Sequence, residues 1–462
     1  MARTKRIPLA GVVSLGCSKN LVDTEYLVGG LGAGGWGLVP DRERADLLLV
    51  NTCAFIGPAV EESHEAIAEA VRWKAGRAGR IVVVAGCMVN RFAEELAARY
   101  PSVDLLLAPK QIPRLAEWLA LAAPRPRRLG SPGRSFLPGG SHDRSLTTGP
   151  WAYLKISDGC SNCCHYCLIP AIRGPHASRP RAAVLDEARA LVDAGVRELN
   201  LVGQDITRFG EDRRGRGLAS LVRAVAALPG DFRVRLLYLH PERVDDGIVR
   251  LFEETPKLCA YLDIPIQHAS GRVLERMNRR YARPDLERLF SALRERIPGV
   301  ALRTTVMVGY PGEGKREFAE LLSFLRAHPF ENLGAFVFSP QPGTRAATMP
   351  GAVAPDEAER RYHAVMTLQA ELASDLWSRR VGRTTEALLL SLEPGRTTAW
   401  NARTPWQAPE VDGRIRVRGR GEAGHWVPVE VTGAGAYDLE GRIRTSPGHA
   451  GQTPSPPLTK GG

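Results

Sequence analysis

The sequence predicts a multidomain α/β protein with an N-terminal parallel α/β domain, a full or partial (β/α) barrel, and a small C-terminal antiparallel β-barrel. Residues 8–122 and 148–375 alternate short apolar runs with amphipathic helical patterns, which is typical of parallel α/β domains. Residues 378–445 instead contain short alternating runs separated by turns, as in small β-barrels. The length of 462 residues also fits roughly two to four domains.

Composition sets limits on the function. The net charge is +12, from 62 Lys and Arg against 50 Asp and Glu, which is compatible with nucleic-acid or ribosome association. An Arg-rich genome explains the same excess, so the charge does not establish such a partner. Eight cysteines are too few for a disulfide scaffold of this length, and clustered cysteines in a reducing compartment indicate metal binding or catalysis.

Targeting signals are weak. No apolar run approaches the ~18 residues that span a membrane. The basic N-terminus is followed by a short apolar stretch that Pro8 interrupts, which makes a poor signal peptide. We therefore expect a cytoplasmic protein with no membrane partner.

The N-terminal domain places a cysteine after each of its first three predicted strands. Its predicted strands cover residues 11–14, 46–51, 80–85 and 103–107, and its helices cover 21–31, 59–74 and 91–99. Cys17, Cys53 and Cys87 follow the first three strands. Because the carboxyl ends of parallel strands gather ligands at one edge, these three thiols can converge on one cluster. A single such cysteine would more often be a small buried residue.

Residues 123–147 are rich in Pro, Gly and Arg and show no apolar periodicity. This stretch predicts a linker with local flexibility between two domains.

The central region carries a tight cysteine loop. Cys160, Cys164 and Cys167 have C-x-x-x-C-x-x-C spacing, after a strand-like run at 151–157 and a turn at 158–159. Iron–sulfur clusters normally have four Cys ligands, so three thiolates from one loop leave one iron open. A structural zinc site would close its tetrahedron, usually with a further pair of Cys or His ligands, and no C-x-x-C occurs outside residues 160–167. A zinc knuckle or chance clustering is the alternative.

Two further cysteines have simpler interpretations. Cys163 lies off the motif spacing, so we expect it to remain unligated, with a cluster of exchanged ligands as the alternative. Cys259 stands alone at the start of a predicted strand, which indicates a buried structural thiol.

Polar segments follow the strands of the central region. The predicted strands cover 198–202, 233–239, 260–264, 301–308 and 335–338, and helices cover 185–194 and 218–228. Residues 203–205, 240–243, 265–268 and 309–313 come directly after four of these strands. Active sites of (β/α) barrels lie at this face, so the segments and Cys160 outline one pocket.

The C-terminal region begins with a helix at 362–380. Strands are predicted at 387–392, 415–417 and 427–431, with turns at 412–413 and 440–441, in a five-stranded barrel. From Arg379 to Arg444 there are 11 Arg and 8 acidic residues, an excess too small to decide between RNA and protein substrates. The Pro/Gly-rich residues 446–462 are expected to be disordered.

The central motif resembles the signature of the radical S-adenosylmethionine superfamily. That resemblance implies a radical-SAM core in which Cys160, Cys164 and Cys167 hold a [4Fe-4S] cluster. The open iron of such a cluster binds the amino and carboxylate groups of S-adenosylmethionine, and reduction yields a 5′-deoxyadenosyl radical.

The segment around Cys17 narrows the resemblance. Residues 14–25, SLGCSKNLVDTE, resemble the opening of the methylthiotransferases and specifically their RimO branch. The tRNA-modifying MiaB branch typically has Gln-Met-Asn after this cysteine. Residues 51–56, 86–87 and 173–180 fit RimO too, whereas Ser18 departs from the usual Pro. Residues 381–445 resemble a TRAM domain.

The resemblance implies two [4Fe-4S] clusters, the auxiliary one at Cys17, Cys53 and Cys87. It implies insertion of a methylthio group at the β-carbon of an aspartate in small-subunit ribosomal protein S-twelve, free or in the subunit. It further implies a low-potential electron donor such as flavodoxin or ferredoxin, a sulfur donor, and no catalytic residues beyond the cluster ligands. S-adenosylmethionine contacts are expected from Gln204, Gln267 and Gly309.

Two alternatives stay open at this point. A tRNA adenosine methylthiotransferase of the MiaB type would share the chemistry, although the Cys17 segment disfavours it. A non-catalytic, zinc-bearing RNA-binding protein would use the cysteines structurally. Iron and acid-labile sulfide analysis separates the zinc alternative from both enzymes.

Overall fold

The computed structural model describes residues 6–120, 127–129, 137, 144–146 and 148–444. The chain divides into two compact units, Met1–Ala373 and Ser374–Gly462. The predicted linker at 123–147 lies mostly outside the described residues, and the tail expected at 446–462 lies wholly outside them. No helix within the described ranges is long and apolar enough to cross a membrane.

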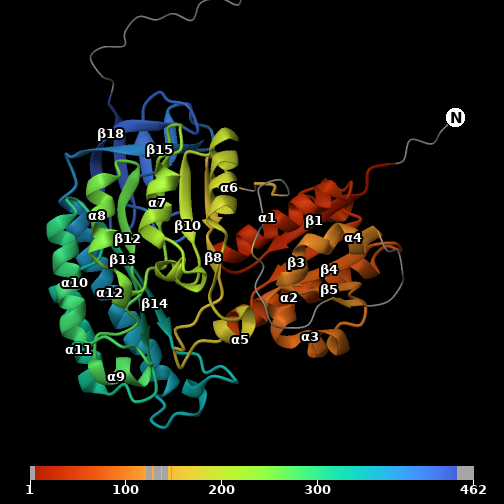
Figure 1. The fold of residues 1–462 in the computed structure, drawn as a ribbon, viewed down its shortest axis with the longest axis horizontal. Coiled ribbons are helices and arrows are strands. Elements are labelled where there is room, and N and C mark those ends of the chain that lie inside the picture. Colours follow the sequence, from red (N-terminus) through yellow and green to blue (C-terminus); the bar gives the residue numbers. More distant parts are fainter. Residues whose placement is uncertain (1–5, 121–126, 130–136, 138–143, 147, 445–462) are drawn as a thin grey trace, which may run out of the picture. The chain divides into compact units, whose positions relative to one another are not determined.

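The N-terminal region forms a six-stranded parallel sheet in the order β2-β1-β3-β4-β5-β6 (Figure 1). All four predicted strands are present, and the two edge strands, β2 and β6, were not predicted. The strands are β1 (Leu9–Ser14), β2 (Gly37–Leu38), β3 (Leu47–Thr52), β4 (Ile81–Gly86), β5 (Leu105–Leu107) and β6 (Arg127–Leu129). The helices are α1 (Ser18–Ala33), η1 (Arg42–Arg44), α2 (Gly57–Ala75), α3 (Cys87–Arg99), η2 (Pro109–Arg114) and α4 (Leu115–Ala120).

The strand order creates a switch point between β1 and β3. These two strands are neighbours, but the chain leaves β1 toward β2 and leaves β3 in the opposite direction, toward β4. In doubly wound sheets the diverging connections open a crevice outside the carboxyl ends of such strands, and ligands bind there.

The central region forms a second parallel sheet, with strands in the sequential order β7-β10-β11-β12-β13-β14. This sheet has two edges within the described residues, so the barrel is partial. Its strands are β7 (Trp151–Lys155), β10 (Glu198–Val202), β11 (Arg233–Leu236), β12 (Leu258–Asp263), β13 (Ala301–Val308) and β14 (Asn332–Val337). The short strands β8 (Ser157–Asp158) and β9 (Ala177–Ser178) pair separately.

Helices connect these strands. The helices are α5 (Ile169–Arg173), α6 (Arg181–Asp193), α7 (Leu218–Ala226), α8 (Asp246–Glu254), α9 (Gly271–Arg276), α10 (Arg283–Arg296), α11 (Lys315–Ala327) and α12 (Pro355–Ser378). The 3-10 turns are η3 (Ile206–Arg208), η4 (Glu211–Arg213), η5 (Pro241–Arg243) and η6 (Arg345–Thr348).

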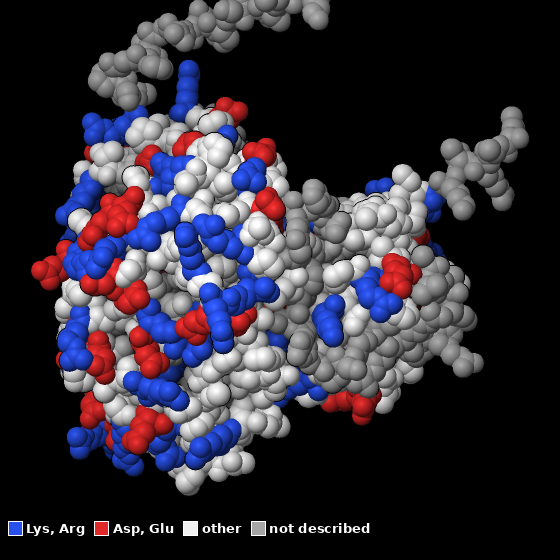
Figure 2. Space-filling model, viewed as in Figure 1, with Lys and Arg blue, Asp and Glu red and all other residues white. Residues whose placement is uncertain are grey.

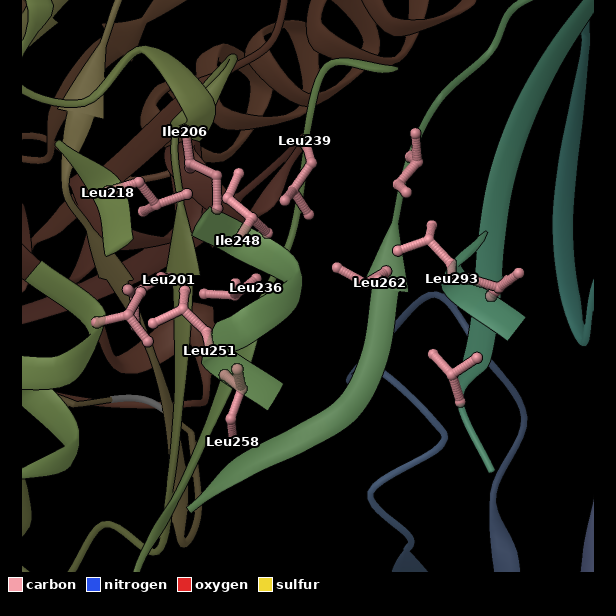
Figure 3. Close-up of a cluster of buried hydrophobic side chains, with 14 of the residues drawn as sticks. Leu201, Ile206, Leu218, Leu236, Leu239, Ile248, Leu251, Leu258, Leu262 and Leu293 are labelled. Carbon is pink, nitrogen blue, oxygen red and sulfur yellow. The ribbon is translucent and has the colours of Figure 1, made fainter. Parts of the chain in front are cut away.

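Apolar side chains from the sheet and its covering helices form one core. In Figure 3, Leu201, Leu236 and Leu262 from three neighbouring strands lie near Ile248 and Leu251 of α8. All five residues of β10 are buried. Both β10 and β13 mix polar residues with apolar ones, and the sequence predicted both strands with their observed bounds.

The C-terminal unit is a closed five-stranded barrel, as predicted, and its strands follow the order β15-β16-β17-β19-β18. Its strands are β15 (Thr384–Leu392), β16 (Ala399–Arg403), β17 (Ile415–Arg418), β18 (Trp426–Ala434) and β19 (Leu439–Ile443). Four pairings are antiparallel, and β17 pairs with β19 in parallel. The turn predicted at 440–441 was wrong, because both residues lie within β19 and the chain turns just before it.

Replacing Leu236 with Ala should destabilise the first unit. Leu236 is fully buried between strands and helices, so its truncation removes apolar contacts and leaves a cavity. We expect a loss of about 2–5 kcal/mol in the free energy of unfolding, measured by urea denaturation. Phe336→Ala on β14, where the side chain is 52% exposed, is the control and should cost about 1 kcal/mol or less. Equal losses in both variants would contradict this account of the core.

Candidate active site

The structure brings Cys17, Cys53 and Cys87 together at the switch point. Cys17 precedes the first turn of α1, Cys53 directly follows β3, and Cys87 begins α3 after β4. A side chain at Gly16 would lie 3.1 Å from the Cys53 sulfur, so Gly16, with φ of +92°, lets the first loop approach the second. The three thiols also interact electrostatically, since each anionic neighbour disfavours ionisation of the next.

Charge around this group is uneven. Burial raises the pKa of the Cys87 thiol to about 12, although the Arg173 guanidinium opposes the rise. Cys17 keeps solvent-accessible surface, and partial desolvation would raise its pKa. The positive charge of Lys19, with smaller contributions from backbone amides and Arg173, outweighs desolvation and lowers the pKa of Cys17. The site therefore favours the thiolate of the exposed Cys17 more than that of the buried Cys87.

The second cysteine group lies in the loop after β8. Cys160 donates its amide hydrogen to the Gly174 carbonyl over 3.1 Å. A Cβ at Gly159, where φ is +72°, would lie 2.1 Å from the Pro175 carbonyl oxygen, so glycine is required there. The Cys167 amide donates to the Cys164 carbonyl over 3.1 Å and closes the loop on itself.

The thiols of this loop are also close together. Burial raises the pKa of Cys160 to about 11 and that of Cys167 to about 12, and the negative charge of Cys164 adds to both shifts. The Ile169 amide donates to the Cys167 sulfur over 3.4 Å. Metal binding would replace these protons, because thiolates rather than thiols are ligands.

Neighbouring residues of the loop point elsewhere. Cys163 is exposed, and its φ of +53° turns the chain at that position. The His165 ring nitrogen Nδ1 hydrogen-bonds to the Arg276 carbonyl over 2.9 Å. Cys259 is buried within β12, as its predicted structural role requires.

A buried polar network holds the loop against the strand ends. Arg243 donates to Asp205 and to Asn162, each over 2.6 Å, and Asn162 donates to Asp205 over 2.8 Å. Burial raises the pKa of Asp205, but the charge of Arg243 outweighs it and the net pKa is lowered. The loop is thus tied to the segments that follow β10 and β11.

The three predicted contacts of S-adenosylmethionine lie after β10, β12 and β13. The Gln204 side-chain oxygen is buried and has no hydrogen-bond partner among the residues described. Gln267 has a φ of +66° and exchanges backbone hydrogen bonds with Thr305 and Met307. A Cβ at Gly309 would lie 2.6 Å from Ala358. The orphaned amide oxygen of Gln204 is a free acceptor for a ligand.

A cluster of buried charges connects the two cysteine groups. Asp23 of α1 accepts hydrogen bonds from Lys155 of β7 and, over 2.6 Å, from Arg173 of α5. Both cations also contact Asp158 of β8, over 3.3 and 3.2 Å. All four side chains are at most 1% exposed. We call these four residues the charge cluster.

Arg173 extends the charge cluster to the first cysteine group. Its Nε donates to the Cys87 sulfur over 3.1 Å, and its second terminal nitrogen donates to the Asn20 side chain over 3.2 Å. Sequence reasoning missed this role. Two features of the sequence could have indicated buried charges. Lys155 ends an otherwise apolar strand, and residues 18–25 contain more polar residues than one solvent-facing side of a helix can hold.

A second buried ion-pair group lies nearby. Arg144 contacts both Glu25 and Glu187 over 2.5 Å, and Arg179 also donates to Glu187 over 2.5 Å. Glu25 lies within one helical turn of Asp23, so two neighbouring positions of α1 are held to the central region by charges.

Each cysteine group offers thiols to a metal centre. Within the described ranges, no group of three His, Cys, Asp or Glu side chains is arranged to hold one metal ion. Three neighbouring thiols, with cationic or amide donors at a sulfur, are the donor set that iron–sulfur clusters use.

Comparison with known proteins agrees with this arrangement. Residues 10–108 match the Uncharacterized protein family UPF0004, residues 154–325 match the Radical SAM superfamily, and residues 381–443 match the TRAM domain. A Ribosomal protein uS12 methylthiotransferase RimO from Geobacter sulfurreducens is 40% identical over 442 residues, covering 94% of this chain and 98% of the relative. This chain belongs to the RimO family of radical SAM methylthiotransferases.

Other members give the same picture. The RimO proteins of Trichlorobacter lovleyi and Dictyoglomus thermophilum are 41% and 40% identical, covering 93% and 94% of this chain and 96% and 99% of the relatives. Membership of the radical SAM superfamily brings a [4Fe-4S] cluster and S-adenosylmethionine as cofactors.

Among solved structures, the radical S-adenosylmethionine methyltransferase TsrM from Kitasatospora setae is similar with a TM-score of 0.53. It is 17% identical, and the match covers 73% of this chain and 77% of that one. At this identity the likeness shows the fold alone.

Replacing Asp23 with Asn should destabilise the first unit strongly. The change removes one of two carboxylates that face Lys155 and Arg173, and leaves buried positive charge poorly compensated. We expect a loss of about 3 kcal/mol in the free energy of unfolding, measured by urea denaturation. The matched control Asp186→Asn removes an exposed ion pair with Arg189 and should change stability by less than about 1 kcal/mol. If Asp23→Asn left the free energy of unfolding unchanged, the charge cluster would not be what holds α1 against β7 and α5.

Proposed function

We propose that this RimO-family enzyme inserts a methylthio group at the β-carbon of an aspartate in small-subunit ribosomal protein S-twelve. The observation that carries the proposal is the pair of three-cysteine groups, one at the switch point and one after β8, connected through Arg173. The names of the curated relatives support the ribosomal protein as substrate.

The proposal assigns one [4Fe-4S] cluster to each cysteine group. Cys160, Cys164 and Cys167 would hold the cluster that binds S-adenosylmethionine. Cys17, Cys53 and Cys87 would hold an auxiliary cluster. The support is the convergence of three thiols in each case, although they come from three strand ends in one and from a single loop in the other.

When bound, the clusters and S-adenosylmethionine would together supply the radical that removes hydrogen from the aspartate and the methylthio group that replaces it. The chain's own residues position and shield these groups. Asn162, Asp205 and Arg243 hold the loop of Cys160 in place. Arg173 offers a fixed positive charge beside Cys87, which favours its thiolate.

Gln204, Gln267 and Gly309 would contact S-adenosylmethionine. Gln204 supports this with its buried, unpartnered acceptor oxygen. The positive φ of Gln267 and of Gly309 turns the backbone at two strand ends, where a ligand could approach main-chain atoms.

The names of the relatives favour the protein substrate over tRNA, because they refer to ribosomal protein modification. On the face drawn in Figure 2, both Lys or Arg and Asp or Glu side chains are exposed. A low-potential donor such as flavodoxin or ferredoxin, a sulfur donor and a cytoplasmic location complete the proposal.

The direct test is an anaerobic assay with reductant and S-adenosylmethionine on two substrates, the S-twelve loop peptide and unmodified tRNA. Mass spectrometry should find a methylthio adduct on the peptide's aspartate and none on the tRNA. An adduct on the tRNA alone would keep the cofactors but overturn the proposed substrate.

The two-cluster assignment predicts a separable defect. Replacing Cys17, Cys53 or Cys87 with Ala should abolish methylthio transfer but leave cleavage of S-adenosylmethionine to 5′-deoxyadenosine, because the other loop is intact. Iron should fall from about eight to about four per chain after reconstitution. Cys163→Ala, at the exposed cysteine beside the second group, is the control and should retain both iron and transfer. Zinc without sulfide in the parent enzyme would contradict both assignments.

A further inference from the structure

Lys19 is a buried cation that has no carboxylate at ion-pair distance among the described residues. Its side chain begins two residues after Cys17, in the first turn of α1, and the residue is only 7% exposed. Its ammonium lies 3.4 Å from the centroid of the Tyr238 ring. In the part of the chain that the structure describes, no carboxylate lies within ion-pair distance of it, although buried lysines are normally paired.

The carboxylate that attracts Lys19 electrostatically is already engaged. Asp263 accepts a hydrogen bond from the Tyr238 amide over 3.0 Å and lies 3.8 Å from Arg303. The Tyr238 ring, through a cation–π contact, and the Cys17 thiol therefore stabilise the charge of Lys19 more than this carboxylate does. Such a contact leaves the other side of the ammonium, with its N–H donors, available to an anion.

Lys19 also lies between the Cys17 segment and the carboxyl face of the central sheet. Tyr238 follows β11 at that face, and its hydroxyl contacts the Ser18 hydroxyl over 3.1 Å. The φ of Tyr238 is +64°, an uncommon conformation for an aromatic residue, and it presents the ring to the Cys17 segment. Lys19 therefore lies at the same face of the central sheet as the loop of Cys160, which follows β7 and β8.

We propose that Lys19 is a specificity-determining residue that binds the carboxylate of the substrate aspartate. The inference rests on the proposed function, because it takes an aspartate side chain as the group to be modified. A buried cation fixed on an aromatic ring complements a carboxylate and would be left unpaired by a neutral side chain. Lys19 thereby selects aspartate over the isosteric asparagine. By holding the carboxylate, it also orients the adjoining β-carbon toward the cysteine groups.

The test is a double-mutant cycle on binding. Fluorescence anisotropy would measure the Kd of labelled S-twelve loop peptides carrying Asp or Asn at the target position. The reconstituted holoenzyme would be used with S-adenosylmethionine and no reductant, so that no turnover occurs. The parent enzyme should bind the Asp peptide roughly tenfold to a hundredfold more tightly than the Asn peptide.

Lys19→Met keeps the length and apolar stem of the side chain but removes its charge, so it should bind the two peptides within about twofold of each other. Lys19→Arg keeps the charge and should recover most of the preference for Asp. Because both peptides are measured on each variant, a general loss of stability cancels in the ratio. Lys257→Met is the matched control, since Lys257 also lies over an aromatic ring, that of Phe232, at 4.1 Å. It should retain the full preference.

Two results would overturn the proposal. One is an unaltered preference for the Asp peptide in Lys19→Met, which would make Lys19 a packing residue only. The other is equal binding of both peptides by the parent enzyme, which requires no variant to fold. If the parent enzyme methylthiolates the Asp peptide and still binds both equally, the proposed function stands and this inference fails. If it modifies no peptide at all, the proposed function fails as well.

Discussion

The contact of Asp23 with Lys155 and Arg173 is the interaction on which the arrangement of the first unit depends. It joins α1, from the N-terminal sheet, to β7 and α5 of the central region. These charges are buried, where attraction between opposite charges is strong and an unpaired charge is costly. The elements that carry them therefore cannot separate without exposing an uncompensated charge, and the positions of the cysteines follow.

Helix α5 belongs to both regions. Arg173 at its end contacts Cys87, while Leu168 and Ile172 pack in the apolar core of the N-terminal region. Cys167 lies just before the same helix, with its sulfur held by the Ile169 amide. One short helix thus links a cysteine of each group. A fixed position of the two groups relative to each other would suit the proposed chemistry, in which both act on one side chain.

The pKa of Cys17 is shifted in the opposite direction to that of the buried cysteines of both groups. Lys19 and Arg173 favour the thiolate of the exposed Cys17, whereas burial disfavours the thiolates of Cys53, Cys87, Cys160 and Cys167. The same cation, Lys19, that lowers the pKa of Cys17 is left without a carboxylate partner among the described residues. Charge complementarity to an acidic substrate is therefore built from the residue next to the proposed auxiliary cluster.

The sequence by itself determined most of the helices and strands and the two candidate groups of cysteines. Apolar residues mixed with polar ones set β10 and β13, and the spacing of Cys160, Cys164 and Cys167 defined one loop. Edge strands β2 and β6 and the barrel strands β16 and β19 escaped prediction, because short or partly polar strands lack a clear period. The predicted turn at 440–441 failed because Gly441 is required inside β19, where a side chain would lie 3.0 Å from Ile415.

Only the tertiary structure decided which distant residues meet. Lys155 and Asp23 are 132 residues apart, and Arg173 and Asp23 are 150 apart. Likewise, Ser18 and Tyr238 are separated by 220 residues. The hydrophobic periodicity of a segment indicates whether a side chain faces the core or water. It does not indicate which charged residue, distant in the sequence, a buried charge will contact. That pairing is set by how the two sheets pack, since burial makes each unpaired charge too costly to keep.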